Sequence, residues 1–128
     1  MIQKFLSISD IVKSLKKNKK TIGLCHGVFD VLHYGHLKHF EAAKKKCDYL
    51  FVSITSSQFI KKGPNRPINN DNERLFFLKN LKLIDHAFFA KGESGVDSIN
   101  LIKPSFYFKG NDYKKNTSDK TKKILYEI

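Results

Sequence analysis

Four short apolar segments alternate along the chain with segments whose apolar residues recur at helical spacing. The segments typical of strands cover residues 21–25, Tyr49–Ile54, 87–89 and 105–108. A continuous apolar run such as Tyr49–Ile54 is typical of a strand buried on both faces of a parallel sheet. Strands that alternate with helices predict an α/β fold, with a doubly wound parallel sheet and right-handed crossovers.

Helical spacing predicts helices between and around these strands. In the first helix, Ser9 or Asp10 caps the amino end and three residues line one face: Ile11, Val12 and Leu15. The second covers 35–46 and turns three residues inward: Leu37, Phe40 and Ala43. The other predicted helices run from a cap at Asn69 or Asn70 to Asn80, over Val96–Ile102, and over 121–128.

The net charge of +12 has two interpretations. The lysines are spread over several runs, at 16–20, 44–46, 61–62, 114–115 and 122–123. Most of these runs flank predicted helices, so they are expected to be solvated surface, and no nucleic-acid partner is expected. A basic RNA-binding domain remains the less favoured alternative. A small polyanion such as a nucleoside triphosphate suits the same charge.

Cysteine usage and hydropathy indicate the compartment. Two cysteines, Cys25 and Cys47, form no disulfide framework, which favours a reducing environment. The first residues lack the apolar run of a signal peptide, and no stretch approaches the ~20 apolar residues of a membrane span. We therefore expect a cytoplasmic protein with no membrane partner.

The segment 27–36, between the first strand and the second helix, carries the clearest chemistry. A helix start offers free backbone amides and the positive end of the helix dipole. Gly27 and Gly35 lack a Cβ, so phosphate oxygens can approach the backbone closely. His33 and His36 lie one turn apart and can donate to the same anion, more strongly as phosphate charge builds in a transition state. The pattern predicts a phosphate site.

Other interpretations of this segment stay open. The apolar residues, Phe29 among them, belong to the core, and Asp30 is a candidate cap of the turn. His39 continues the spacing of His33 and His36, which suggests a metal site. However, these positions spread around a helix and no nearby carboxylate or thiolate completes the set, so we expect no metal ligands here.

The pattern Gly-x-Phe-Asp-x-x-His-x-Gly-His at 27–36 contains the HxGH signature and resembles the cytidylyltransferase-like branch of the nucleotidyltransferase superfamily. Three further motifs follow in the expected order: Arg66-Pro67-Ile68-Asn69, Glu73-Arg74 and Lys109-Gly110-Asn111-Asp112-Tyr113. They resemble the heptose-phosphate adenylyltransferase domain of lipopolysaccharide biosynthesis more than glycerol-3-phosphate cytidylyltransferase. The resemblance covers residues 8–115 and implies Rossmann-like topology.

The resemblance implies that a sugar phosphate or polyol phosphate attacks the α-phosphate of CTP or ATP and pyrophosphate leaves. The products of such a reaction are cell-surface glycan or lipopolysaccharide precursors. The protein aligns the reactants and neutralises charge, and Mg²⁺ accompanies the triphosphate without a dedicated protein cage. Relatives of this kind suggest a homodimer and a fused or partner sugar kinase. A non-catalytic nucleotide-binding module is the alternative function.

The resemblance also implies roles for individual residues. It implies catalytic roles for His33, His36 and Lys62, and contacts to the acceptor substrate for Asp30 and Lys61. Nucleotide contacts are implied for Gly27, Val28, Phe29, Gly35, Arg74, Lys109, Gly110, Asn111 and Asp112. Two alternatives stay open: the lysines are surface loop residues, and Arg74 forms a surface pair with Glu73.

The sequence departs from the family pattern in two places. Residues 54–57 lack the acidic residue that often follows the second strand in the family. Family members also continue into a further strand and a Ser/Thr-rich turn that contacts the triphosphate, whereas this sequence ends at Ile128. We therefore expect residues 1–128 to be one domain without its last strand and helix. Either it is a piece of a longer protein or its site is incomplete.

Overall fold

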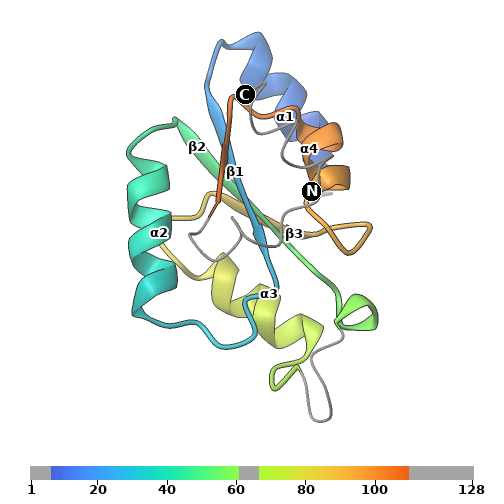
Figure 1. Cartoon of the computed structure of the whole chain (residues 1–128). Coiled ribbons are helices and arrows are strands. Elements are labelled where there is room, and N and C mark those ends of the chain that lie inside the picture. Colours follow the sequence, from blue (N-terminus) through green and yellow to red (C-terminus); the bar gives the residue numbers. More distant parts are fainter. Residues whose placement is uncertain (1–6, 61–66, 110–128) are drawn as a thin grey trace, which may run out of the picture.

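The structure is a computed structural model, which describes residues 7–60 and 67–109. Within these residues a parallel sheet has the strand order β3-β2-β1-β4 (Figure 1). Its strands are β1 (Ile22–Gly27), β2 (Tyr49–Ile54), β3 (His86–Phe89) and β4 (Phe106–Phe108). β1 pairs with β2 and β4, and β2 pairs with β3, always in parallel. The predicted doubly wound α/β fold is confirmed.

Helices cover both faces of the sheet. They are α1 (Ile8–Lys17), α2 (Tyr34–Lys44), α3 (Asp71–Lys79) and α4 (Val96–Ile102), with a short 3₁₀ turn, η1 (Ser57–Phe59), after β2. Figure 1 shows α1 and α4 on one side of the sheet and α2 and α3 on the other. The predicted helix over 121–128 lies outside the described residues.

Two apolar cores explain why the central strands are apolar without alternation. Ile22, Leu24 and Phe51 pack with residues of α1 and α4. Cys25 and Val52, the alternate residues, pack with residues of α2 and α3 on the other face. Because side chains alternate across a strand, a strand buried on both faces needs apolar residues at successive positions.

The helix starts differ from the predictions in two places. Ser7 caps α1, since its Oγ accepts a hydrogen bond from Asp10 N at 3.1 Å. The predicted caps Ser9 and Asp10 therefore lie inside the first turn. Leu37 was expected to face inward but is 38% exposed, because α2 packs on the sheet through its later turns, at Phe40 and Ala43.

The strands and cysteines agree with the sequence patterns. β1 is longer than predicted and reaches Gly27, since its ladder with β2 continues to Ile54. Cys25 and Cys47 are free thiols, and Cys25 is buried as expected. Among the described helices, none has the length and apolar character needed to cross a membrane.

Candidate active site

Polar segments from several strands meet at one edge of the sheet. The turn that starts at Val28 follows β1, Thr55 follows β2 and Lys109 follows β4. Because β1, β2 and β4 are parallel neighbours, their carboxyl ends lie at the same edge. Ligands of open α/β sheets bind outside this edge, so the structure brings the predicted segments to one place.

His33 and His36 form the amino end of α2. The helix begins at Tyr34, one residue before the predicted start, and His33 is its cap. His33 Nδ1 accepts from Gly35 N at 3.0 Å, and His36 Nδ1 accepts from His33 N at 3.2 Å. This is a capping box in which imidazole nitrogens replace the usual oxygens. The two rings lie 4.0 Å apart between centroids.

These hydrogen bonds fix the tautomer of both histidines. A ring nitrogen that accepts from a backbone N–H carries no proton, so each neutral ring holds its proton on Nε2. Within the described residues, neither Nε2 has a hydrogen-bond partner. Burial, and then the neighbouring His33 and His39, lower the pKa of His36, which favours its neutral form. The site therefore presents two N–H donors at the positive end of the α2 dipole. The expected free amides of Gly35 and His36 are instead engaged by the His33 side chain and carbonyl.

The ring of Phe29 packs against the ring of His36. It lies edge-on to His36 at 5.5 Å and contacts Phe40 at 5.4 Å between centroids. The Phe29 backbone has φ 50°, a left-handed conformation that is strained for a residue with a side chain. The expected core position of Phe29 thus also orients a histidine of the turn.

The two glycines make room for these rings. A Cβ on Gly27 would lie 2.8 Å from Phe29 Cζ, and a Cβ on Gly35 would lie 2.8 Å from His33 Cε1. The expected reason for both glycines was close approach of phosphate. The structure adds a different reason, because the missing Cβ atoms leave space for the aromatic rings of the turn itself.

Arg74 is a buried support of the site. Its side chain is 1% exposed, so the alternative of a surface pair with Glu73 is wrong. The guanidinium donates to the carbonyl oxygens of Thr55 at 2.6 Å, Val28 at 3.0 Å and Asn69 at 3.2 Å. It also pairs with Asp71. Arg74 therefore holds together the segments after β1, after β2 and before α3, while its nucleotide contact stays a prediction.

Glu73 and Asp30 both accept hydrogen bonds from backbone N–H groups. Glu73 forms a capping box with Asn70, which confirms Asn70 as the cap of α3. The Asp30 carboxylate accepts from the backbone N–H groups of Ile68 and Asn69, each at 2.9 Å. These bonds join the segment after β1 to the segment before α3, so they do not show the considered cap of the 27–36 turn itself. The contact of Asp30 to an acceptor substrate stays a prediction.

Several predicted site residues cannot be placed. Lys109 is described and lies directly after β4. Five others lie outside the described residues: Lys61, Lys62, Gly110, Asn111 and Asp112. His39 of the considered metal set contacts Cys25, with 3.7 Å between Nε2 and Sγ. Within the described residues, no three His, Cys, Asp or Glu side chains group as metal ligands.

Sequence reasoning missed a polar cluster at the same edge. His26, Ser53 and Thr55 are buried, although they belong to or directly follow the apolar strands β1 and β2. The available signal was a polar residue at alternate positions, 53 and 55, at the end of a strand.

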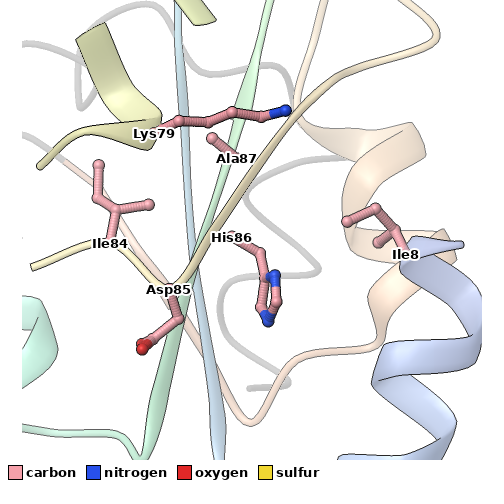
Figure 2. Close-up of a pocket in the computed structure, with 6 residues that line it drawn as sticks. All are labelled: Ile8, Lys79, Ile84, Asp85, His86 and Ala87. Carbon is pink, nitrogen blue, oxygen red and sulfur yellow. The ribbon is translucent and has the colours of Figure 1, made fainter. Parts of the chain in front are cut away.

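Two hollows lie in the described part of the chain, and both are away from the segment 27–36. One lies along α3 at Asn72, Glu73, Phe76 and Phe77. The other, shown in Figure 2, lies beside β3 and is lined by Ile8, Lys79, Ile84, Asp85, His86 and Ala87. Neither includes a residue of the segment 27–36, which is therefore defined by its converging donors.

Comparison with known proteins identifies the family. The family model described as cytidylyltransferase-like matches residues 24–128, so the chain belongs to the cytidylyltransferase-like family. This confirms the resemblance to that family and defines the class as a nucleotidyltransferase.

The relatives with similar sequences include bifunctional HldE proteins. The chain is 36% identical over 115 residues to the bifunctional protein HldE of Nitratiruptor sp., covering 88% of this chain and 25% of that protein. It is 35% identical over 114 residues to HldE of Aliarcobacter butzleri, covering 88% of this chain and 24% of that protein. The chain thus spans about a quarter of the length of these relatives.

A solved structure of another protein has a similar fold. The lipopolysaccharide core biosynthesis protein from Thermoplasma volcanium superposes with a TM-score of 0.72 at 27% identity. The match covers 84% of this chain and 88% of that one. The arrangement of strands and helices is therefore shared over most of both chains.

Proposed function

We propose that this chain transfers a nucleotidyl group from CTP or ATP to a sugar phosphate or polyol phosphate and releases pyrophosphate. The observation that carries the proposal is the pair of Nε2–H donors of His33 and His36 at the start of α2. The cytidylyltransferase-like family and the HldE relatives support the same reaction class. We further propose that the reaction takes place in the cytoplasm and supplies lipopolysaccharide precursors.

The chemistry needs no nucleophile from the protein. A phosphate oxygen of the acceptor forms a bond to the α-phosphorus of the triphosphate. The bond from that phosphorus to the oxygen bridging to the β-phosphate breaks, and pyrophosphate leaves with the electron pair. Negative charge therefore grows on phosphate oxygens, which is where the donors of His33 and His36 would act.

The surrounding residues hold these donors in place. Arg74 fixes the carbonyl of Val28, and with it the backbone that lines the proposed nucleotide site. Phe29 holds the ring of His36. Such positioning lowers the entropy that the reactants lose when they reach the transition state.

Mg²⁺ is proposed to arrive with the triphosphate. This ion keeps several waters and binds mainly through substrate phosphates, where it neutralises their charge. The nearby Asp30 carboxylate is taken up by two backbone N–H groups, so no described residue is assigned to hold the ion. A homodimer and a fused or partner sugar kinase are proposed as protein partners.

The test is pyrophosphate release by the full protein with CTP or ATP and a panel of phosphorylated sugars and polyols. Release that depends on one nucleotide and one acceptor class supports the proposal and selects between CTP and ATP. Calorimetry with each nucleotide runs beside the assay. Binding without turnover across the panel would instead identify a non-catalytic nucleotide-binding module. Absence of both would reject the proposal.

A further inference from the structure

His26 is a buried histidine to which the proposed reaction gives no role. It is the penultimate residue of β1 and is 9% exposed. Its Nδ1 lies 2.7 Å from Ser53 Oγ, its register partner on β2, and its Nε2 lies 3.3 Å from Thr55 Oγ1. Both ring nitrogens are therefore engaged, unlike those of His33 and His36.

These contacts continue to the segment between β3 and α4. Thr55 Oγ1 donates to the carbonyl oxygen of Glu93 at 3.5 Å. Gly95 packs against the histidine, because a Cβ there would lie 3.2 Å from His26 Cβ and Cγ and would also meet the Tyr107 hydroxyl. The segment 93–95 thus rests directly on His26, on the α4 face of the sheet.

The hydrogen bonds form a chain with one consistent direction. Because the Thr55 hydroxyl donates to Glu93, its oxygen is left to accept from His26 Nε2–H. His26 Nδ1 then accepts from the Ser53 hydroxyl. Burial lowers the pKa of His26 and outweighs a hydrogen bond to the Glu93 backbone, which acts in the opposite direction, so the neutral ring is the favoured form. The chain runs from Ser53, near the carboxyl end of β2, to the 93–95 segment.

The end of β1 therefore serves both sides of the candidate site. Gly27 and Phe29 lead to the histidine turn on the α2 face, whereas His26 supports the 93–95 segment on the α4 face. A ligand across the carboxyl ends of β1 and β2 lies between the two. We propose that His26 is a positioning residue of the nucleotide site, which sets the 93–95 segment as the wall opposite His33 and His36. This inference rests on the proposed function.

Two substitutions separate the two ring nitrogens. In His26→Asn the amide occupies the place of Nδ1 and keeps the Ser53 contact, but it does not reach Thr55. In His26→Gln the amide occupies the place of Nε2 and keeps the Thr55 contact. We expect His26→Asn to raise KM for the nucleotide about tenfold, the usual scale for one lost hydrogen bond, with kcat within about twofold. We expect His26→Gln to change KM by less than about threefold.

Amide hydrogen exchange of residues 93–96 gives a second readout that needs no activity. It is expected to be faster in His26→Asn than in the wild type and nearly unchanged in His26→Gln. His86→Asn is the matched control, because His86 is the first residue of β3 and its ring lies tilted against Phe51, 4.8 Å away between centroids. We expect it to change neither KM nor this exchange. If His26→Asn does not fold, Thr55→Val removes the same link.

The outcomes separate this inference from the proposed function. Equal effects of Asn and Gln at His26, or exchange of residues 93–96 in His26→Asn equal to that in His86→Asn, would overturn the positioning role alone. A wild-type protein that neither binds nor turns over nucleotide would overturn the proposed function, and the positioning role with it. Elevated KM and faster exchange confined to His26→Asn and Thr55→Val would support both.

Discussion

The two faces of the sheet use histidine in opposite ways at the end of β1. On the α2 face, Nδ1 of His33 and of His36 accepts a hydrogen bond from the helix backbone. The other ring nitrogen of each has no partner among the described residues. On the α4 face, His26 has both nitrogens engaged by hydroxyl groups. Under the proposed function, the number of engaged ring nitrogens distinguishes a histidine that can donate to a ligand from one that holds the fold.

The pKa values alone do not make this distinction. Burial lowers the pKa of His26 and of His36 alike. Both rings are therefore mainly neutral, yet only the turn histidines offer donors to a ligand. The comparison can be tested by substituting the buried support Arg74, the two donor histidines and the two glycines beside them, and by changing the pH.

Arg74→Ala is expected to have the largest effect. It leaves the carbonyls of Val28, Thr55 and Asn69 without a buried donor, so we expect a loss of about 3–5 kcal/mol in the free energy of unfolding. Chemical denaturation measures it. The exposed Lys79→Ala serves as control and is expected to stay within about 0.5 kcal/mol. Similar values for the two variants would contradict the support role of Arg74.

His36→Ala is expected to lower turnover by about 10²–10³, the scale for losing one transition-state donor. His33→Asn sharpens the test, because asparagine is a good helix cap but lacks the Nε2–H donor. We expect His33→Asn to lose turnover while its melting temperature stays near the wild-type value. His33→Ala is expected to lose turnover and about 1 kcal/mol of stability. Full activity of His33→Asn would show that His33 acts only as a cap.

Gly27→Ala is expected to be destabilising by about 1–3 kcal/mol, because its Cβ would press on the buried side of the Phe29 ring. In Gly35→Ala the new Cβ meets only the ring of the exposed His33, so we expect a loss of at most about 1 kcal/mol, the value of the His33 cap, partly offset by the helix preference of alanine. Thermal unfolding of the two variants measures the difference. Equal stabilities would mean that Phe29 adjusts freely and does not hold His36.

The smallest expected effect is a pH dependence of stability. Burial lowers the pKa of His26, His36, His39 and His86 below the unfolded value of about 6.5. The unfolded chain therefore takes up protons first, so stability falls as the pH drops below about 6.5. The pKa of Asp48 is also lowered, by hydrogen bonds from Thr21, but its contribution is lost only in more acidic solution.

Unfolding at pH 5.5 and pH 7.5 measures this effect. We expect lower stability at pH 5.5 and a smaller difference between the two pH values in His26→Asn than in the wild type. His36→Asn is expected to retain more of the pH dependence, because the ring of His36 is less buried. Equal stability at both pH values would contradict neutral buried histidines in the folded state.

The parallel sheet and the position of the 27–36 turn could be predicted from the sequence. Apolar runs such as Tyr49–Ile54 predicted buried strands, and the 27–36 motif predicted where they meet a helix. Exact caps were harder, because Ser7, Ser9 and Asp10 are all good caps and only the backbone conformation selects Ser7. The burial of Arg74 could not be predicted from the sequence, because its carbonyl partners Val28 and Thr55 are distant in the chain.

The hydrogen bonds around His26 could not be predicted from the spacing of residues in the sequence. They join residues of β1 and β2 that become neighbours only through the strand register, and they continue to a backbone carbonyl that no side-chain pattern records. The roles of Lys61, Lys62 and Asn111 stay predictions, because these residues lie outside the described part of the chain.

The alternation of His26 and Gly27 between the two faces of β1 has a consequence for how this protein can evolve. A shift of one residue in a strand exchanges the side chains of its two faces. An insertion or deletion within β1, between Leu24 and His26, would therefore turn His26 toward α2 and Gly27 toward α4. The number of residues in this part of β1 is therefore constrained in its own right, in addition to the identity of each residue.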